Sequence, residues 1–336
     1  MPRGCSFRRV NGATSAILVV VARRELPLLP GLRRPATWLE LALDYRCNLR
    51  CLGCHACDAA GESMSSTAAV RALREGRRRG CSRLWLGGGE PTLRADLLAL
   101  VRAARAMGYV EVLLQTNGVR LSYPAYRDAV LAAGVTEVRF NVKSSRAELH
   151  DRLSQGECHR FLLAALGGLV GAPVIVSADV LLARSSLPDL PDVVSFYGGR
   201  GVTRMVLWLL SASDGEDPEV TREIPSFTEV IPWLTLADGQ ARRSAVELHS
   251  LHTPLCVLPP ALRHLFWPAS SLGLIVTGPD GGSFALETSP FESGPFLDGC
   301  GACAERPRCG GPRADYVRIH GGAELVPVAR AEGSRE

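Results

Sequence analysis

Short apolar runs alternate along the chain, from residue 36 onward, with longer stretches rich in alanine, leucine and arginine. A short apolar run followed by glycine or polar residues is typical of a buried parallel strand, and the longer stretches have helical length. The expected helices lie near residues 65–79, 95–107, 123–133, 158–170, 188–199 and 226–239. The expected strands are Trp38–Asp44, Arg83–Gly87, Val110–Thr116, Val135–Lys143, Pro173–Leu181 and Val202–Leu210.

Strands that alternate with helices form parallel βαβ units with right-handed crossovers. Counting gives six units before the pattern changes near residue 244, which favours an α/β fold, a partial (β/α)6 TIM-like barrel, over a complete eight-unit barrel or a doubly wound sheet. Beyond that point, apolar runs flank the turn Gly278–Gly282 and predict a cysteine-rich extension with a β-hairpin and helix. The expected divisions are a β-ribbon lead-in (1–35), the barrel (36–243), the extension (244–329) and a disordered tail (330–336).

Side chains on alternate strand positions point to opposite faces, so the apolar face of each strand should pack on helices. A purely structural barrel interior is filled with branched apolar side chains, whereas the inward positions here are polar. This pattern predicts that the interior binds a ligand. The expected inward residues are Glu40, Ala42, Asp44, Gln115, Arg139, Asn141, Lys143, Ser177 and Asp179.

Composition narrows the class of protein. A net charge of +4 over 336 residues gives no reason to expect a nucleic-acid partner. The apolar stretch 13–22 is too short to span a bilayer, and the turn signal Asn11-Gly12 before it favours a β-ribbon, so no membrane partner is expected. Eleven cysteines in clustered spacings, in a chain of this length, indicate metal binding more than a disulfide framework.

The first cysteine group follows the first expected strand directly. Cys47, Cys51 and Cys54 are spaced C-x3-C-x2-C, so one loop can wrap three thiolates around a single cuboidal iron–sulfur cluster. Four irons with three cysteine ligands leave one iron open. A zinc site that includes the nearby Cys57 is the alternative.

This loop resembles the cluster loop of the radical S-adenosylmethionine (SAM) superfamily, and two further segments carry the resemblance. Residues Leu84–Leu93 resemble the GGEP segment and Val112–Gly118 the strand-plus-TNG segment, in the same order and each at the end of an apolar run. Two positions depart from the family pattern, since Gly53 and His55 stand where aromatic residues are common.

The resemblance implies a [4Fe–4S] cluster whose open iron is chelated by SAM. An electron from the cluster then cleaves SAM to methionine and a 5′-deoxyadenosyl radical. In the family the GGEP segment holds the SAM amino group, and the TNG segment lies near the ribose. The residues expected to bind SAM are Gly88, Gly89, Glu90, Pro91, Gln115, Thr116, Asn117, Lys143 and Asp179.

Lys143 is the only lysine in a chain whose other basic residues, within a Lys+Arg count of 38, are all arginine. Lysine is a compact point charge on a flexible stem, and arginine is a planar fork. We expect Lys143 to bind the SAM carboxylate or to assist catalysis on the substrate. The alternative is a residue without a function on a solvated loop edge.

A second cysteine group follows the predicted hairpin. Cys300, Cys303 and Cys309 are spaced C-x2-C-x5-C and, with Cys256 as fourth ligand, resemble a reduced form of the SPASM/twitch extensions that bind auxiliary [4Fe–4S] clusters. The full pattern has one more cysteine, at the position of Arg313. A structural zinc site is the alternative. The cysteines not expected to be ligands are Cys5, Cys57, Cys81 and Cys158.

The predicted function is that of a radical SAM enzyme that abstracts hydrogen from its substrate. An auxiliary cluster favours an oxidative or bond-forming modification, most simply of a ribosomal peptide. Only about 35 residues precede the barrel, too few for a separate peptide-recognition domain, so a partner would present the peptide. The alternatives are a small-molecule substrate (a sugar, cofactor precursor or natural product) and a non-catalytic iron–sulfur or zinc protein for electron transfer or sensing. Flavodoxin or ferredoxin is the expected reductant, and the cytoplasm the expected compartment.

Overall fold

The structure is a computed structural model, which describes residues 32, 35–54, 56, 62–212, 217–289 and 292–329. The predicted β-ribbon, the apolar stretch 13–22, Cys5, Cys57 and the predicted disordered tail lie outside the described residues. Among the described residues, no helix combines the length and the apolar character needed to cross a bilayer.

The six predicted strands form a parallel sheet in chain order, which confirms the predicted α/β partial barrel. Each bound lies within two residues of its expected position, because each apolar run ends where a glycine or polar loop begins. The strands are β1 (Trp38–Asp44), β2 (Arg83–Gly88), β3 (Glu111–Thr116), β4 (Glu137–Val142), β5 (Ile175–Leu182) and β6 (Arg204–Leu209).

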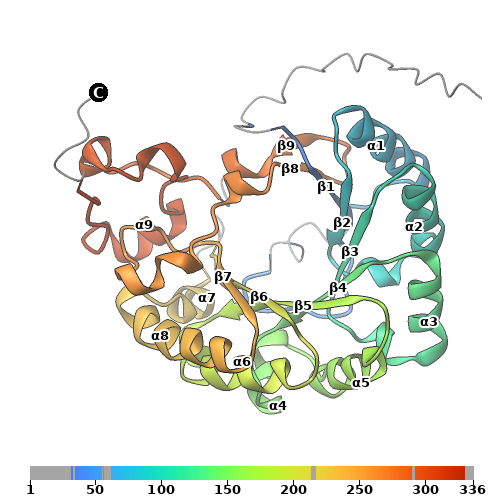
Figure 1. The fold of residues 1–336 in the computed structure, drawn as a ribbon, viewed down its shortest axis with the longest axis horizontal. Coiled ribbons are helices and arrows are strands. Elements are labelled where there is room, and N and C mark those ends of the chain that lie inside the picture. The colour runs from blue at the N-terminus through green and yellow to red at the C-terminus, as the bar shows by residue number, and fades with distance from the viewer. Residues whose placement is uncertain are drawn as a thin grey trace, which may run out of the picture.

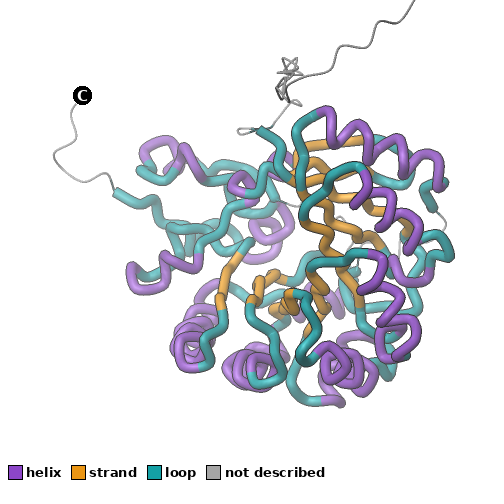
Figure 2. The backbone as a smooth tube through the Cα atoms, turned by 45° about the vertical axis from the view of Figure 1, so that its right-hand side comes forward, coloured by secondary structure: helices purple, strands orange, loops and turns teal. Residues whose placement is uncertain are grey.

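Helices surround the outside of this curved sheet, as Figures 1 and 2 show. The predicted helices are all present, and two short helices, α4 and α7, were not predicted. The helices are α1 (Ser66–Arg78), α2 (Leu97–Ala106), α3 (Pro124–Ala133), α4 (Ala147–Ser154), α5 (His159–Leu169), α6 (Leu190–Gly198), α7 (Pro218–Glu223), α8 (Phe227–Arg243) and α9 (Ala314–His320).

The apolar residues form separate clusters on the two faces of the sheet. The larger cluster lies between strands and helices and takes the alternate residues Leu39, Leu41 and Leu43 of β1. A smaller cluster, which includes Trp85, Leu113 and Val206, lies on the opposite face of the strands and therefore in the barrel interior. Apolar side chains therefore share the predicted polar interior with buried polar ones, since Glu137 is in register with Leu113.

Three further strands from the C-terminal part extend the same sheet. Strand β7 (Glu247–Ser250) pairs in parallel with β6, β8 (Leu274–Thr277) pairs in parallel with β1, and β9 (Ser283–Ala285) pairs antiparallel to β8. The sheet order is β7-β6-β5-β4-β3-β2-β1-β8-β9, so β7 and β9 are its two edge strands, and Ser250 of β7 forms an isolated bridge with Phe266. We call the gap between these edges the seam. The remaining C-terminal residues form the lobe beside the seam, drawn in red in Figure 1.

Candidate cluster and cofactor site

The predicted cluster loop begins where β1 ends, at the C-terminal mouth of the barrel. Cys47, Cys51 and Cys54 are all half-buried. The backbone N–H of Leu49 donates to Cys47 Sγ at 3.4 Å. Backbone donors to sulfur tune iron–sulfur centres, so the local chemistry suits a cluster ligand.

Gly53 explains why the loop departs from the aromatic residue common in the family. Its φ is +67°, and a Cβ added there would lie 2.7 Å from Leu210 Cδ1 and 2.8 Å from Ser211 O, at the end of β6. A larger residue would therefore push the loop away from the barrel.

The GGEP segment packs backbone to backbone against the same loop. Gly89 N donates to Asp44 O at 2.6 Å, and Glu90 N donates to Arg46 O at 2.9 Å. A Cβ on Gly89 would lie 2.3 Å from Arg46 O, and a Cβ on Gly88 would lie 2.6 Å from Asp44 O. Glycine at both positions is required by this close approach.

Asp44 fixes the start of the loop through arginine contacts. Its carboxylate accepts hydrogen bonds from Arg46 Nε at 2.9 Å and from Ser63 Oγ at 3.0 Å. Burial pushes the pKa of Asp44 upward, but the hydrogen bonds from Arg46 and Ser63 outweigh it and hold the pKa below its ordinary value. Arg94 donates to the neighbouring carbonyl of Leu43 at 3.1 Å.

Glu90 joins the GGEP segment to the TNG segment. Its Oε1 accepts hydrogen bonds from Thr92 Oγ1 at 2.6 Å and Thr116 Oγ1 at 2.8 Å, and its Oε2 accepts one from Asn117 N at 2.8 Å. Burial raises the pKa of Glu90, and these hydrogen bonds oppose the rise. Asn117 Nδ2 in turn donates to Asn48 Oδ1 at 2.8 Å, inside the cluster loop. The three motifs are therefore one hydrogen-bonded unit, with Pro91 beginning the short turn Pro91–Leu93 beside it.

Gln115 and Asp179, both predicted to contact SAM, lie deeper in the barrel and bind each other. Gln115 Nε2 donates to Asp179 Oδ2 at 2.7 Å, and Trp208 Nε1 donates to Asp179 Oδ1 at 2.9 Å. Arg139 lies 3.8 Å from the same carboxylate and 2.8 Å from Glu137. Burial raises the pKa of Asp179, and Arg139 opposes this effect.

Lys143 follows β4 directly and is 3% exposed. Its backbone N–H donates to His150 Nδ1 at 3.4 Å. Burial and then the charge of Lys143 lower the pKa of His150 to about 2, so this imidazole is neutral. Cys158 interacts electrostatically with both Lys143 and Cys51, which places the lysine near the cluster loop. Within the described residues, the ammonium makes no hydrogen bond or ion pair to the protein.

The structure also brings the four C-terminal cysteines together. Burial, and then the negative charges of Cys309, Cys303 and Cys300, raise the pKa of Cys256 to about 11. A bound metal centre reverses such an effect, since coordination deprotonates a thiol. Gly311 N donates to Cys309 Sγ at 3.3 Å and Val328 N to Cys303 Sγ at 3.4 Å, again backbone donors to sulfur.

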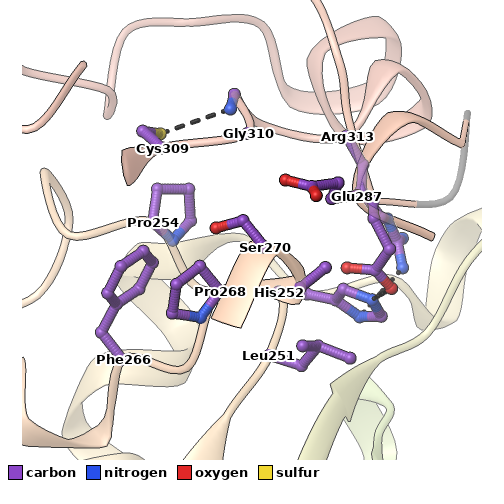
Figure 3. A pocket seen from close by; sticks show the side chains of 13 residues that line it. Leu251, His252, Pro254, Phe266, Pro268, Ser270, Glu287, Cys309, Gly310 and Arg313 are labelled. Carbon is purple, nitrogen blue, oxygen red and sulfur yellow. Dashed lines mark hydrogen bonds and ion pairs between the residues drawn. The ribbon is translucent and has the colours of Figure 1, made fainter. Parts of the chain in front are cut away.

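A small pocket lies at the seam beside Cys309, lined by His252, Glu292 and Arg313 (Figure 3). Its volume of about 30 Å³ has room for only one or two water molecules, so it is no substrate site. His252 Nε2 pairs with Glu292 at 2.8 Å, and the His252 ring packs edge-on to Trp208, with centroids 5.2 Å apart. His252 was not among the predicted site residues, and its position just beyond β7 was the available signal.

Arg313, at the position of the missing SPASM cysteine, is a buried clamp. Its guanidinium donates to the carbonyl oxygens of Leu209 at 2.7 Å and Leu210 at 2.6 Å, and pairs with Asp315 at 2.9 Å. Asp315 also accepts from Ala212 N at 3.0 Å. The residue therefore attaches the C-terminal lobe to the end of β6.

Sequence comparison agrees with the resemblance carried by the cluster loop and by the GGEP and TNG segments. Residues 44–177 match the sequence profile of the Radical SAM superfamily. The GTP 3′,8-cyclase of Synechococcus elongatus is 30% identical over 195 residues, which cover 55% of this chain and 58% of that protein. The PqqA peptide cyclase of Ruegeria pomeroyi is 30% identical over 183 residues, which cover 52% of this chain and 48% of that protein. The chain thus spans about half to three fifths of the length of these curated relatives.

Solved structures share the fold at low sequence identity. SuiB of Streptococcus suis, solved bound to S-adenosylmethionine, superposes with a TM-score of 0.66 at 12% identity, over 87% of this chain and 76% of that chain. SuiB bound to its precursor peptide SuiA gives a TM-score of 0.62 at 12% identity, over 74% of this chain and 59% of that chain.

Proposed function

Since this chain belongs to the radical SAM superfamily, we propose that Cys47, Cys51 and Cys54 hold a [4Fe–4S] cluster at which SAM is reductively cleaved. When bound, the cluster supplies the electron that converts SAM to methionine and a 5′-deoxyadenosyl radical. The observation that carries the proposal is the single hydrogen-bonded unit formed by the cluster loop, the GGEP segment and the TNG segment.

Several residues around the loop are proposed to contact SAM, each in a different way. Gly88 and Gly89 let the GGEP backbone lie directly against the loop, and Glu90 orients Thr116 and Asn117. A carboxylate oxygen can accept more than one hydrogen bond, so Glu90 Oε2 retains capacity for the SAM amino group. Lys143 supplies a buried ammonium for the SAM carboxylate. Gln115 and Asp179 form the floor beneath the ligand, through their mutual hydrogen bond.

The C-terminal cysteines Cys256, Cys300, Cys303 and Cys309 are proposed to hold an auxiliary [4Fe–4S] cluster. The C-x2-C-x5-C spacing and its resemblance to the SPASM/twitch extensions, beside a radical SAM barrel, support a cluster over the zinc alternative.

The proposed reaction is an oxidative or bond-forming modification of a peptide, with flavodoxin or ferredoxin as reductant. The likeness to PqqA peptide cyclase in sequence, and to SuiB in fold, supports a peptide substrate. A small-molecule substrate is the second candidate, favoured by the likeness to GTP 3′,8-cyclase. The GGEP and TNG segments, hydrogen-bonded to each other and to the cluster loop, support an enzyme over a non-catalytic electron carrier.

Anaerobic iron and sulfide counting tests the two-cluster proposal. The wild type should hold about eight irons and the Cys47/Cys51/Cys54→Ala variant about four, since each cube carries four irons. Only the wild type should form 5′-deoxyadenosine from SAM under dithionite. The Cys300/Cys303/Cys309→Ala variant should lose iron but still cleave SAM, and Cys81→Ala, a buried thiol on the outer face of the sheet, is the matched control. Zinc in the first site, without SAM cleavage, would refute the proposal.

A further inference from the structure

Glu40 points into the barrel from the middle of β1. Its neighbours Leu39 and Leu41 belong to the outer core, so strand alternation turns Glu40 inward. A Cβ added at Gly87, on the adjacent β2, would lie 3.2 Å from Glu40 Oε1 and 3.2 Å from Gln115 Oε1. The two side chains thus stand close to each other over a glycine that leaves space between them.

Glu40 keeps partial exposure although it points inward. Gln115 and Trp208, on other inward strand positions, are likewise half-buried. Trp85, the register partner of Glu40 on β2, is buried. Part of the Glu40 side chain is therefore accessible from within the barrel.

Every charged neighbour of Glu40 already has a protein partner. Asp179 accepts hydrogen bonds from Gln115 and Trp208, Arg139 pairs with Glu137 at 2.8 Å, and Glu292 pairs with His252 at 2.8 Å. Within the described part of the chain, Glu40 makes no hydrogen bond or ion pair. Its carboxylate is thus available for a group that the protein itself does not supply.

The charges that face Glu40 give the site a negative field. Burial, and then the charge of Asp179, raise the pKa of Glu40 to about 7, with Arg139 opposing the rise and Glu292 adding to it. Tyr45, from the cluster loop, is the remaining titratable neighbour, and its own pKa is raised by burial and by acidic groups that include Glu40. At Glu40, two carboxylates, Asp179 and Glu292, are therefore opposed by one arginine, Arg139.

We propose that Glu40 determines substrate specificity by binding a cationic group of the substrate, an ammonium or a guanidinium, inside the barrel. The proposal rests on the proposed function only in taking the barrel interior as the substrate site. A charge-assisted hydrogen bond in a half-buried site is strong and selective. A lysine or arginine side chain of a peptide has this chemistry, whereas a nucleoside triphosphate would be repelled.

Calorimetry with two peptide probes tests the proposal on anaerobic enzyme carrying its clusters and SAM. The probes are the capped tripeptide Ala-Lys-Ala and the same peptide with an acetylated lysine side chain. At pH 8 the charged probe should bind at least about tenfold more tightly, a difference typical of one charged hydrogen bond. The preference should shrink at pH 6, where Glu40 is protonated, and should be absent at both pH values in Glu40→Gln.

Two variants complete the design. Glu40→Asp keeps the charge and should keep a weaker preference, which provides a readout if Glu40→Gln folds poorly. Glu111→Gln removes a carboxylate at the opposite end of the barrel, paired with Arg83 at 3.1 Å, and should behave as wild type. Equal affinity for the two probes, no binding of either probe, or a preference that survives in Glu40→Gln would overturn the proposal. Deoxyadenosine formation without any probe reports the proposed function separately.

Discussion

Glu90 shows how a buried charge can assemble a site from segments that are distant in the sequence. Its carboxylate accepts hydrogen bonds from Thr92, Thr116 and Asn117, which lie on two different strand ends. Buried carboxylates require such donors, because an unpaired one costs several kcal/mol. Lys143 is the contrasting case, since its buried ammonium binds no protein group among the described residues.

Replacement of Lys143 by methionine should weaken SAM binding about 10- to 100-fold, as expected for loss of one hydrogen bond between charged groups. Methionine keeps the volume of the stem and removes the charge. Isothermal titration of SAM into cluster-loaded protein measures the effect, and iron content should not change. Lys143→Arg keeps the charge but changes its shape, and wild-type affinity in both variants would show that the lysine is not a SAM ligand.

Glu40→Gln should stabilise the protein at pH 8 and not at pH 5. The folded-state pKa of Glu40 is about 7, above the ordinary value of 4.5, so the folded state binds this proton more tightly than the unfolded state. The stability associated with the proton is complete below pH 4.5 and is lost as the pH rises through 7. Glutamine does not titrate, and the gain at pH 8 should be about 1–3 kcal/mol. Thermal unfolding at both pH values measures it, and an equal effect at both would contradict the assignment.

At the scale of single elements, the cluster loop depends on one glycine contact with β6. Gly53 has a positive φ, and a Cβ added there would lie 2.8 Å from Ser211 O, so the loop and the residues after β6 fit only without a side chain. The absence of the family's aromatic residue is thus a local packing solution of this chain.

Gly53→Ala should destabilise the loop by about 1–3 kcal/mol and lower the iron content, since a Cβ adds a clash to the strain of a left-handed conformation. Gly171→Ala is the matched control. Gly171 has a φ of +76°, but a Cβ there meets nothing within 4 Å, so this variant should show only the conformational cost and full iron loading. Equal iron loss in both variants would mean that the contact with Ser211 is irrelevant.

The strands and motifs were predictable from the sequence because their signals are local. A buried parallel strand is a short apolar run, and its loop begins at the next glycine or polar residue. The apolar cluster in the barrel interior and the pairs around His252 and Arg313 were not predictable in this way. Arg313 binds carbonyl oxygens 103 and 104 positions earlier in the chain, and no spacing in the sequence encodes such a contact. Strand alternation correctly predicted that Glu40 points inward, but only the structure revealed that its charged neighbours already have partners.

For the whole molecule, attachment of the C-terminal lobe depends on Arg313. Arg313→Gln should cost about 3–5 kcal/mol, because it leaves Asp315 as an unpaired buried charge and removes the bonds to β6. Arg308→Gln is the control, since Arg308 is exposed and pairs with Glu305 on the surface, and it should cost at most about 1 kcal/mol. Chemical unfolding measures both variants, and similar losses would argue against the clamp.

The seam has a consequence for how the barrel is held together. Elsewhere around the sheet, ladders of backbone hydrogen bonds hold neighbouring strands at a constant separation. Among the described residues, backbone pairing beyond β7 is limited to one bridge between Ser250 and Phe266, and the His252–Glu292 pair joins the residues that follow β7 to those that follow β9. Strands β1 to β7 are therefore fixed to one another by continuous backbone ladders, whereas the side of the barrel next to the cysteine-rich lobe is joined by few backbone bonds.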